Sequence, residues 1–64
     1  MISTTYDPEG DVLYVRIAPQ GTVTAGTQEI EPDVLLDFDG AGHVIGIEIL
    51  NVRFRAAGKY QPIP

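Results

Sequence analysis

Two carboxylic acids, Asp37 and Glu48, are the first candidates for chemistry in this 64-residue sequence. Glu48 interrupts a run of isoleucines, and a carboxyl group buried in such a setting has a raised pKa that suits general acid–base work. The structural alternative places Glu48 on a polar sheet face, in water or paired with Arg16 across the sheet. If Phe38 lies opposite His43, the two carboxyl-bearing positions are about 13 Å apart. That distance would exclude a catalytic pair within one chain.

Acidic residues also crowd one turn, which contains Asp7, Glu9 and Asp11. A calcium-binding helix–loop–helix would need glycine at the sixth position of its loop and glutamate at the twelfth. Counted from Asp7, these positions are Val12 and Ala18, so the motif is absent. We expect Asp7 to accept a hydrogen bond from its own turn backbone, and we expect no metal ion or cofactor.

His43 is the sole histidine, and the chain contains no cysteine. No serine or aspartate spacing completes a nucleophilic triad with His43, so we expect no catalytic residue here but an exposed side chain at the start of a strand. The glycines form no phosphate-binding loop, because no Gly-Lys-Ser/Thr sequence occurs. The last dozen positions contain Arg53, Arg55 and Lys59. These three residues either contact phosphate or an acidic partner, or form a solvated end that offsets an acidic body.

Alternating apolar and polar residues predict the strands that would position these side chains, because a period of two is typical of a strand. Asp7–Gly10 predicts a hairpin turn, with Pro8 at its first central position and Gly10 in a left-handed conformation. Asp39–Gly42 predicts a second hairpin. We therefore expect a mainly β fold, a single antiparallel meander of about five short strands. The candidate strands are Ile2–Tyr6, Val12–Ile17, the weaker Thr22–Ile30, Val34–Phe38 and His43–Leu50.

The alternation sorts these residues onto two sheet faces. One face carries an aliphatic row through Ile45, Ile47 and Ile49, and we expect it to be the core. The opposite face mixes apolar and charged residues, and a sheet of this size cannot bury two apolar faces alone. We therefore expect a homodimer, with the mixed face covered by a second copy, another protein or the C-terminal segment. The candidate binding residues on the mixed face are Tyr14, Arg16, Asp37 and Glu48. The face of Ile2 and Tyr6 depends on the length of the first turn and stays open.

Residues 51–64 differ in composition from residues 1–50, which we take as the antiparallel β domain. In one interpretation Asn51 caps a short helix that ends at Gly58. In the other, the alternation of Leu50, Val52 and Phe54 extends the last strand, and both interpretations stay open. We expect Gln61–Pro64 to be an extended, frayed end.

Nine acidic against four basic residues give a net charge of −5. This charge argues against nucleic-acid binding and favours solubility or a basic partner. A hydrophobic content of 44% excludes bulk disorder. No apolar run approaches the roughly 18 residues of a transmembrane helix, and the first residues do not resemble a signal peptide. We expect a cytoplasmic protein with neither nucleic acid nor membrane as a partner.

Two blocks of the sequence resemble a family of small prokaryotic proteins that is catalogued as a domain of unknown function, with the signature YDPExDxLYxRL … DxDxxGxVxGIEIL. The residues that carry the resemblance are Tyr6-Asp7-Pro8-Glu9, Asp11-Val12-Leu13-Tyr14-Val15-Arg16, Asp37-Phe38-Asp39, Gly42 and Val44-Ile45-Gly46-Ile47-Glu48-Ile49-Leu50. Gly10 stands where the family has alanine, and residues 51–55 match the family's usual short helix only equivocally. The resemblance implies a small β-rich fold without an established activity or ligand. Some members are encoded beside toxin-like proteins, which implies an antitoxin-like role, but no functional residue is carried over.

Our first hypothesis is a non-enzymatic protein–protein interaction module that binds a basic partner, because the sequence contains no complete catalytic constellation. The alternative is a small-molecule-binding protein or minor enzyme, with a site where Tyr14, Arg16 and Glu48 of two chains meet at a homodimer interface. Nucleic-acid binding through the C-terminal basic residues stands third, because an acidic body repels phosphate.

Overall fold

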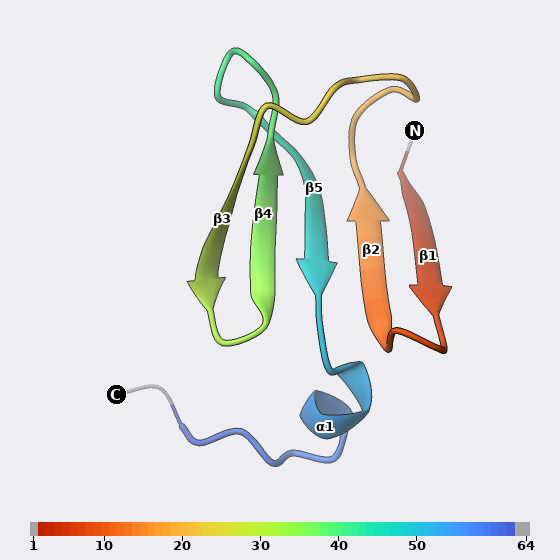
Figure 1. Ribbon diagram of the computed structural model, residues 1–64, viewed down its shortest axis with the longest axis vertical. Helices are drawn as coiled ribbons and strands as arrows, with labels where there is room; N and C mark the ends of the chain where they lie inside the picture. Colours follow the sequence, from red (N-terminus) through yellow and green to blue (C-terminus); the bar gives the residue numbers. More distant parts are fainter. Residues whose placement is uncertain (1, 63–64) are drawn as a thin grey trace.

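The computed structural model describes residues 2–62, which form one antiparallel sheet of five strands followed by a short helix (Figure 1). The mainly β fold predicted from the sequence is confirmed. The candidate strand Thr22–Ile30 is shorter than expected, because its first four residues belong to the preceding connection. The elements are β1 (Ser3–Asp7), β2 (Val12–Arg16), β3 (Gly26–Glu31), β4 (Val34–Phe38), β5 (Val44–Ile49) and α1 (Val52–Ala56).

The strand order across the sheet is β1-β2-β5-β4-β3. A strict meander would place β3 beside β2. Instead, residues 17–25 cross one end of the sheet, and β5 occupies the space between the β1–β2 hairpin and β4 (Figure 1). The strand with the longest isoleucine row thereby obtains hydrogen-bonded neighbours on both sides, and Ile45 and Gly46 are buried there.

The register of the β4–β5 hairpin differs by two residues from the one expected, because Leu36 lies opposite Ile47. Phe38 lies opposite Val44 rather than His43, and the register shifts there at a bulge that takes up Ile45 as an extra residue. A shift of two residues keeps the same faces together. The predicted sides of the sheet are therefore retained, although the predicted pairs are wrong.

The first hairpin turn uses a different left-handed residue from the one predicted. Asp11 has a φ of 56°, whereas Gly10 is not among the residues with positive φ. The turn spans four residues, 8–11, so the reversal of the chain is completed one residue later than expected. Asp7 does accept a hydrogen bond from the amide of Glu9, at 3.0 Å, as expected. Tyr6 then lies opposite Leu13, so its side chain is on the same side of the sheet as that of Leu13, a point that the sequence left open.

The helical interpretation of the C-terminal segment is confirmed, but its capping differs. Asn51 precedes α1 and makes no side-chain capping bond, and its amide group donates instead to Asp33 at 2.9 Å. The carboxylate of Asp11 caps the helix in its place, accepting from the amide of Arg53 at 3.1 and 3.3 Å. No helix among residues 2–62 has the length and apolar character needed to cross a bilayer. Of the expected frayed end, Gln61–Pro64, the last two residues lie outside the described part of the chain.

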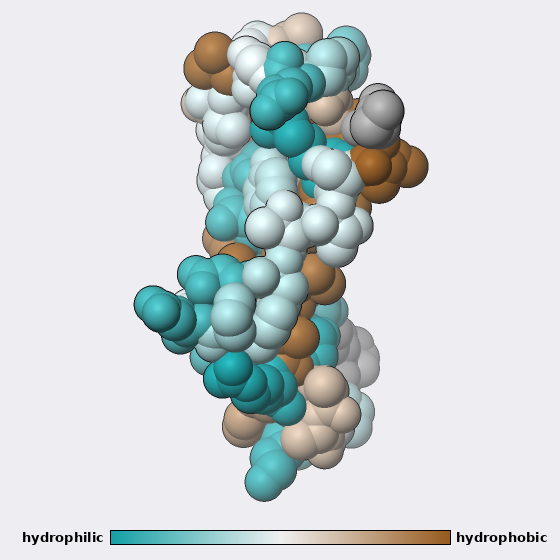
Figure 2. Space-filling model, turned by 90° about the vertical axis from the view of Figure 1, so that its right-hand side faces the viewer, coloured by the Kyte–Doolittle hydropathy of each residue, from teal (hydrophilic) through white to brown (hydrophobic). Residues whose placement is uncertain are grey.

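The aliphatic side of the sheet is not a closed core. We call it the aliphatic face. α1 lies beyond the end of the sheet and covers neither side (Figure 1). Viewed from the β1 edge, the molecule has a narrow profile with hydrophobic residues at its surface (Figure 2). Among the described residues, Ala18 and Ile45 are the only buried hydrophobic ones, so the face expected to be the core is fully buried only at Ile45 and half-buried at its other residues. The aliphatic face consists of Leu13, Val15, Val34, Leu36, Ile45, Ile47 and Ile49.

Candidate functional site

The four residues selected from the sequence lie near the middle of the opposite side, which we call the polar face. They come from three strands: Tyr14 and Arg16 from β2, Asp37 from β4 and Glu48 from β5. Arg16 and Asp37 both lie opposite Gly46, on its two sides, and Tyr14 lies opposite Glu48. The strand order therefore brings together residues that are more than 30 positions apart in the chain. We call these four residues the polar cluster.

Tyr14 lies directly over Gly46, which is the reason that β5 needs glycine there. A Cβ atom at this position would lie 2.7 Å from Cζ of Tyr14 and closer still to its hydroxyl oxygen. Burial raises the pKa of Tyr14, and the neighbouring Asp37 carboxylate raises it further, whereas the Arg16 guanidinium acts in the opposite direction. The tyrosine hydroxyl thus has a carboxylate and a guanidinium group as its charged neighbours.

Asp37 is the most deeply placed acidic group of the cluster, with 4% of its surface exposed. Thr27, opposite it on β3, donates a hydrogen bond from Oγ1 to its carboxylate at 2.7 Å. A buried carboxylate needs such donors, because the loss of hydration is otherwise unfavourable. Sequence reasoning missed Thr27, because its relation to Asp37 depends on the β3–β4 register.

Glu48 lies much closer to Asp37 than expected. It faces Leu35, two residues along β4 from Asp37, so the two acids are diagonal neighbours at a typical Cβ separation of about 7–8 Å. Burial raises the pKa of Glu48, and interaction with the Asp37 carboxylate raises it further. The exclusion of this pair on distance is therefore wrong, and the two-residue difference in register is the reason. Neither does Glu48 lie opposite Arg16.

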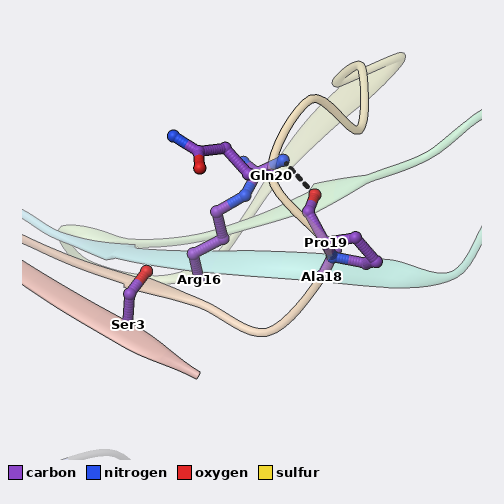
Figure 3. Close-up of a pocket in the computed structure, with 5 residues that line it drawn as sticks. All are labelled: Ser3, Arg16, Ala18, Pro19 and Gln20. Carbon is purple, nitrogen blue, oxygen red and sulfur yellow. Dashed lines mark hydrogen bonds between the residues drawn. The ribbon is translucent and has the colours of Figure 1, made fainter. Parts of the chain in front are cut away.

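Arg16 is held by the connection that follows β2. Its Nη2 atom donates to the carbonyl oxygens of Pro19 and Thr22, each at 3.0 Å. Its Nε atom is buried and has no hydrogen-bond partner in the structure. Figure 3 shows the Arg16 side chain reaching toward this loop, with Ser3 of β1 and Gln20 beside it. These groups line a pocket of about 410 Å³, in which the guanidinium could contact an anion.

The described residues contain no group of three or more His, Cys, Asp or Glu side chains that could hold a metal ion. Asp37 and Glu48 supply two carboxylates, and their neighbours are hydroxyl groups. His43 is exposed over 81% of its side chain and lies 3.8 Å from Asp39, which confirms the expected exposed position at a strand start.

The C-terminal arginines contact the chain itself. Arg53 donates to the carbonyl oxygen of Pro8 at 2.7 Å. Arg55 pairs with Glu31 at 3.0 Å, and its guanidinium lies 4.4 Å from the ring centre of Tyr60. Both arginines therefore hold α1 and the segment after it against the β1–β2 turn and the β3–β4 turn. They are not simply a solvated end, because each uses part of its guanidinium in contacts within the chain.

The sequence of this chain matches a protein-family model over most of its length. The family model described as "Protein of unknown function (DUF2283)" matches residues 3–53. This range includes all five strands, the polar cluster and the start of α1. Neither the comparison with curated proteins nor that with solved structures gave a match. Because the family model covers most of the chain, the protein belongs to this family of unknown function, DUF2283.

Proposed function

We propose that this chain is a non-enzymatic protein–protein interaction module. The observation that carries the proposal is the aliphatic face, which the described part of the chain covers only in part. Six of its seven residues remain only half-buried, and Ile45 alone is fully buried. A contiguous apolar surface of this kind on a small protein typically marks a site of association.

The polar cluster supports binding or structure rather than catalysis. Asp37 is buried against Thr27, and Tyr14 fills the space above Gly46. Arg16 is bound to two loop carbonyls. Three of the four residues thus have intrachain partners that account for their positions, and the contacts join β2, β3, β4 and β5 into one layer.

The net charge of −5 supports a basic protein as a further partner. Asp7 at the end of β1, Glu9 in the first turn and Glu29 on β3 are exposed and available for such contacts. Together with the family resemblance, this charge extends the proposal to an antitoxin-like role, in which the chain occupies the surface of a basic protein.

A small-molecule site is the second candidate, and the closeness of Asp37 and Glu48 favours it. The raised pKa of Glu48 has the direction that an acid–base role requires. This candidate needs the polar faces of two chains to meet, whereas the aliphatic face is the larger uncovered apolar surface. An ordinary pKa of Glu48 in the assembled protein would remove it.

Two neighbouring leucines of β4 provide a matched test of the interaction module. Leu36 belongs to the aliphatic face and lies opposite Ile47, whereas Leu35 lies on the polar face between Glu48 and Glu29. Leu36→Lys places a charge in the proposed interaction surface. Leu35→Lys makes the same change one residue away, where the new ammonium group can form ion pairs with two glutamates.

The measurement is the size at which epitope-tagged chain elutes from host-cell extract. We expect the wild type and Leu35→Lys to elute in a complex larger than the 6.9 kDa chain. We expect Leu36→Lys to elute as a monomer or to be degraded. Wild-type protein that elutes as a folded monomer would contradict the proposal, whatever the variants do.

A further inference from the structure

We infer that the aliphatic face pairs with the same face of a second copy of this chain, forming a two-layer sandwich. The inference rests on the proposed function and identifies the partner of that surface. Sheets that pack face to face lie about 10 Å apart with their strands within about 30° of each other. A second copy would therefore supply the layer that this fold lacks.

Two copies of the aliphatic face can pack against each other without repulsion between like charges. None of its residues is charged, and its neighbours on the edge strands are Thr4 and Tyr6 of β1 and Gln28 and Glu31 of β3, of which Glu31 is already paired with Arg55 at 3.0 Å. Asp37 and Glu48 lie on the opposite side of the sheet. Two copies, each with a net charge of −5, can thus bring these faces together without placing like charges in contact.

The surface area of the chain matches the needs of such a dimer. Its accessible surface is 4582 Å² at a mass of 6.9 kDa, whereas a compact monomer of this mass exposes about 4,000 Å². Its radius of gyration is 12.7 Å, against about 10.7 Å for a compact chain of this length. Burying the excess of about 600 Å² on each copy gives about 1,200 Å² in total, the lower end of stable protein interfaces.

The small core explains why the partner is the chain's own copy. With Ala18 and Ile45 as the only buried hydrophobic residues among those described, the folded state depends on the layer added by association. That layer must be present whenever the chain folds, and a second copy is synthesised together with the first. Obligate homodimers often have no stable folded monomer, and their stability rises with their own concentration.

The position of β5 defines the centre of the sandwich. It is the middle strand of the sheet, so a two-fold axis between the layers passes near Ile47, and Leu36 beside it contacts the partner layer. The two polar clusters then lie on the outer surfaces. This arrangement separates the residues that a catalytic site at the interface would need to bring together.

The experiment uses the purified full chain. Native mass spectrometry is expected to give twice the 6.9 kDa mass for the wild type and for Leu35→Lys, and the monomer mass or no folded protein for Leu36→Lys. Nuclear Overhauser contacts are then measured in a mixture of isotope-labelled and unlabelled wild-type chains. We expect contacts between copies at the methyl groups of Ile47 and Leu36.

A dimer whose contacts between copies involve the methyl groups of Val12 and Leu35 on the polar face, or the residues of β1, would overturn the inference. A purified monomer that elutes in a larger complex from host extract would also overturn it, because another protein then covers the aliphatic face, and the interaction module would stand. A folded monomer in both samples would overturn the inference and the proposed function together.

Discussion

Gly46→Ala is expected to destabilise the sheet, because the new methyl group would occupy space that Tyr14 fills. The added Cβ would lie 2.7 Å from Cζ and 3.2 Å from Cε2 of the tyrosine ring. The ring must therefore turn away, and its hydroxyl would leave Asp37. Without this crowding the same substitution would stabilise a strand by about 0.5–1 kcal/mol, because alanine loses less conformational freedom than glycine.

The expected loss follows from three contributions. Crowding in a well-packed site reduces stability by about 1–3 kcal/mol. Removing a polar partner from the buried Asp37 carboxylate reduces it by about another 1–3 kcal/mol. Subtracting the gain from alanine leaves a net loss of about 3 kcal/mol in the free energy of unfolding. A loss of this size is a large fraction of the stability of a small domain.

A double-mutant cycle measured by urea unfolding at fixed protein concentration tests this reasoning. The four proteins are the wild type, Gly46→Ala, Tyr14→Val and the double variant. We expect Gly46→Ala to be destabilising in the wild type but neutral or slightly stabilising beside Tyr14→Val, because valine leaves the space above residue 46 open. An equal effect in both backgrounds, or no loss in the wild type, would refute the proposed role of Gly46.

Three further predictions concern titratable and basic groups. Burial and a neighbouring carboxylate raise the pKa of Glu48, so its ionised form destabilises the fold. Glu48→Gln should therefore increase the free energy of urea unfolding at about pH 7 and change little at about pH 3.5, below the ordinary pKa. The hydrogen bond from Tyr6 is the main cause that lowers the pKa of Asp11, so its stabilisation is lost as the pH falls through that lowered pKa. Asp11→Ala should lower the thermal midpoint at about pH 7, and the difference should shrink in acid. Arg55→Lys should reduce the free energy of urea unfolding by about 1–2 kcal/mol, because lysine cannot keep the paired hydrogen bonds and the stacking on Tyr60.

Each of these predictions has a distinct contrary result. Equal stability of Glu48→Gln and the wild type at about pH 7 would show that the ionised carboxyl group is well solvated. A difference for Asp11→Ala that persists unchanged into acid would mean that its charge is not what holds the helix. Full stability of Arg55→Lys would show that a simple positive charge is enough.

The strands could be predicted because their signal is local. The alternation in Val12–Arg16 and Val34–Phe38 is visible in each segment alone, and both strands occur at those positions. The same alternation placed all four residues of the polar cluster on one face, since parity along a strand does not depend on which strand lies beside it. The order of the strands depends on a long connection, and no local pattern reveals it.

The distance between Asp37 and Glu48 could not be predicted, because it depends on the register of the hairpin. A bulge at Ile45 and the closure of the loop by a bond from the Asp39 amide to the His43 carbonyl, at 2.9 Å, shift that register by two residues. Turn composition alone does not distinguish these registers. The difference of two residues in the register of β4 and β5 was enough to make Asp37 and Glu48 diagonal neighbours, although the sequence had placed them far apart.

Three functional contacts were missed because they join distant segments. Thr27 reaches Asp37 from the neighbouring strand, 10 positions away in the chain, and Asp11 caps a helix that begins 41 positions later. Gly46 did leave a signal, since an isolated glycine inside an apolar strand often marks the close approach of another group. The tyrosine that occupies this space could be identified only once β2 was known to lie beside β5.

The accessibility of methyl groups to a soluble paramagnetic probe tests the central claim most directly, because it reports whether the aliphatic face is covered in solution. The account predicts slow relaxation enhancement for Leu36 and Ile47 in the purified wild-type protein. It predicts faster enhancement for Leu35 and Val12 on the polar face. A folded protein in which the methyl groups of both faces relax equally fast would show an aliphatic face in contact with water, and would contradict the account.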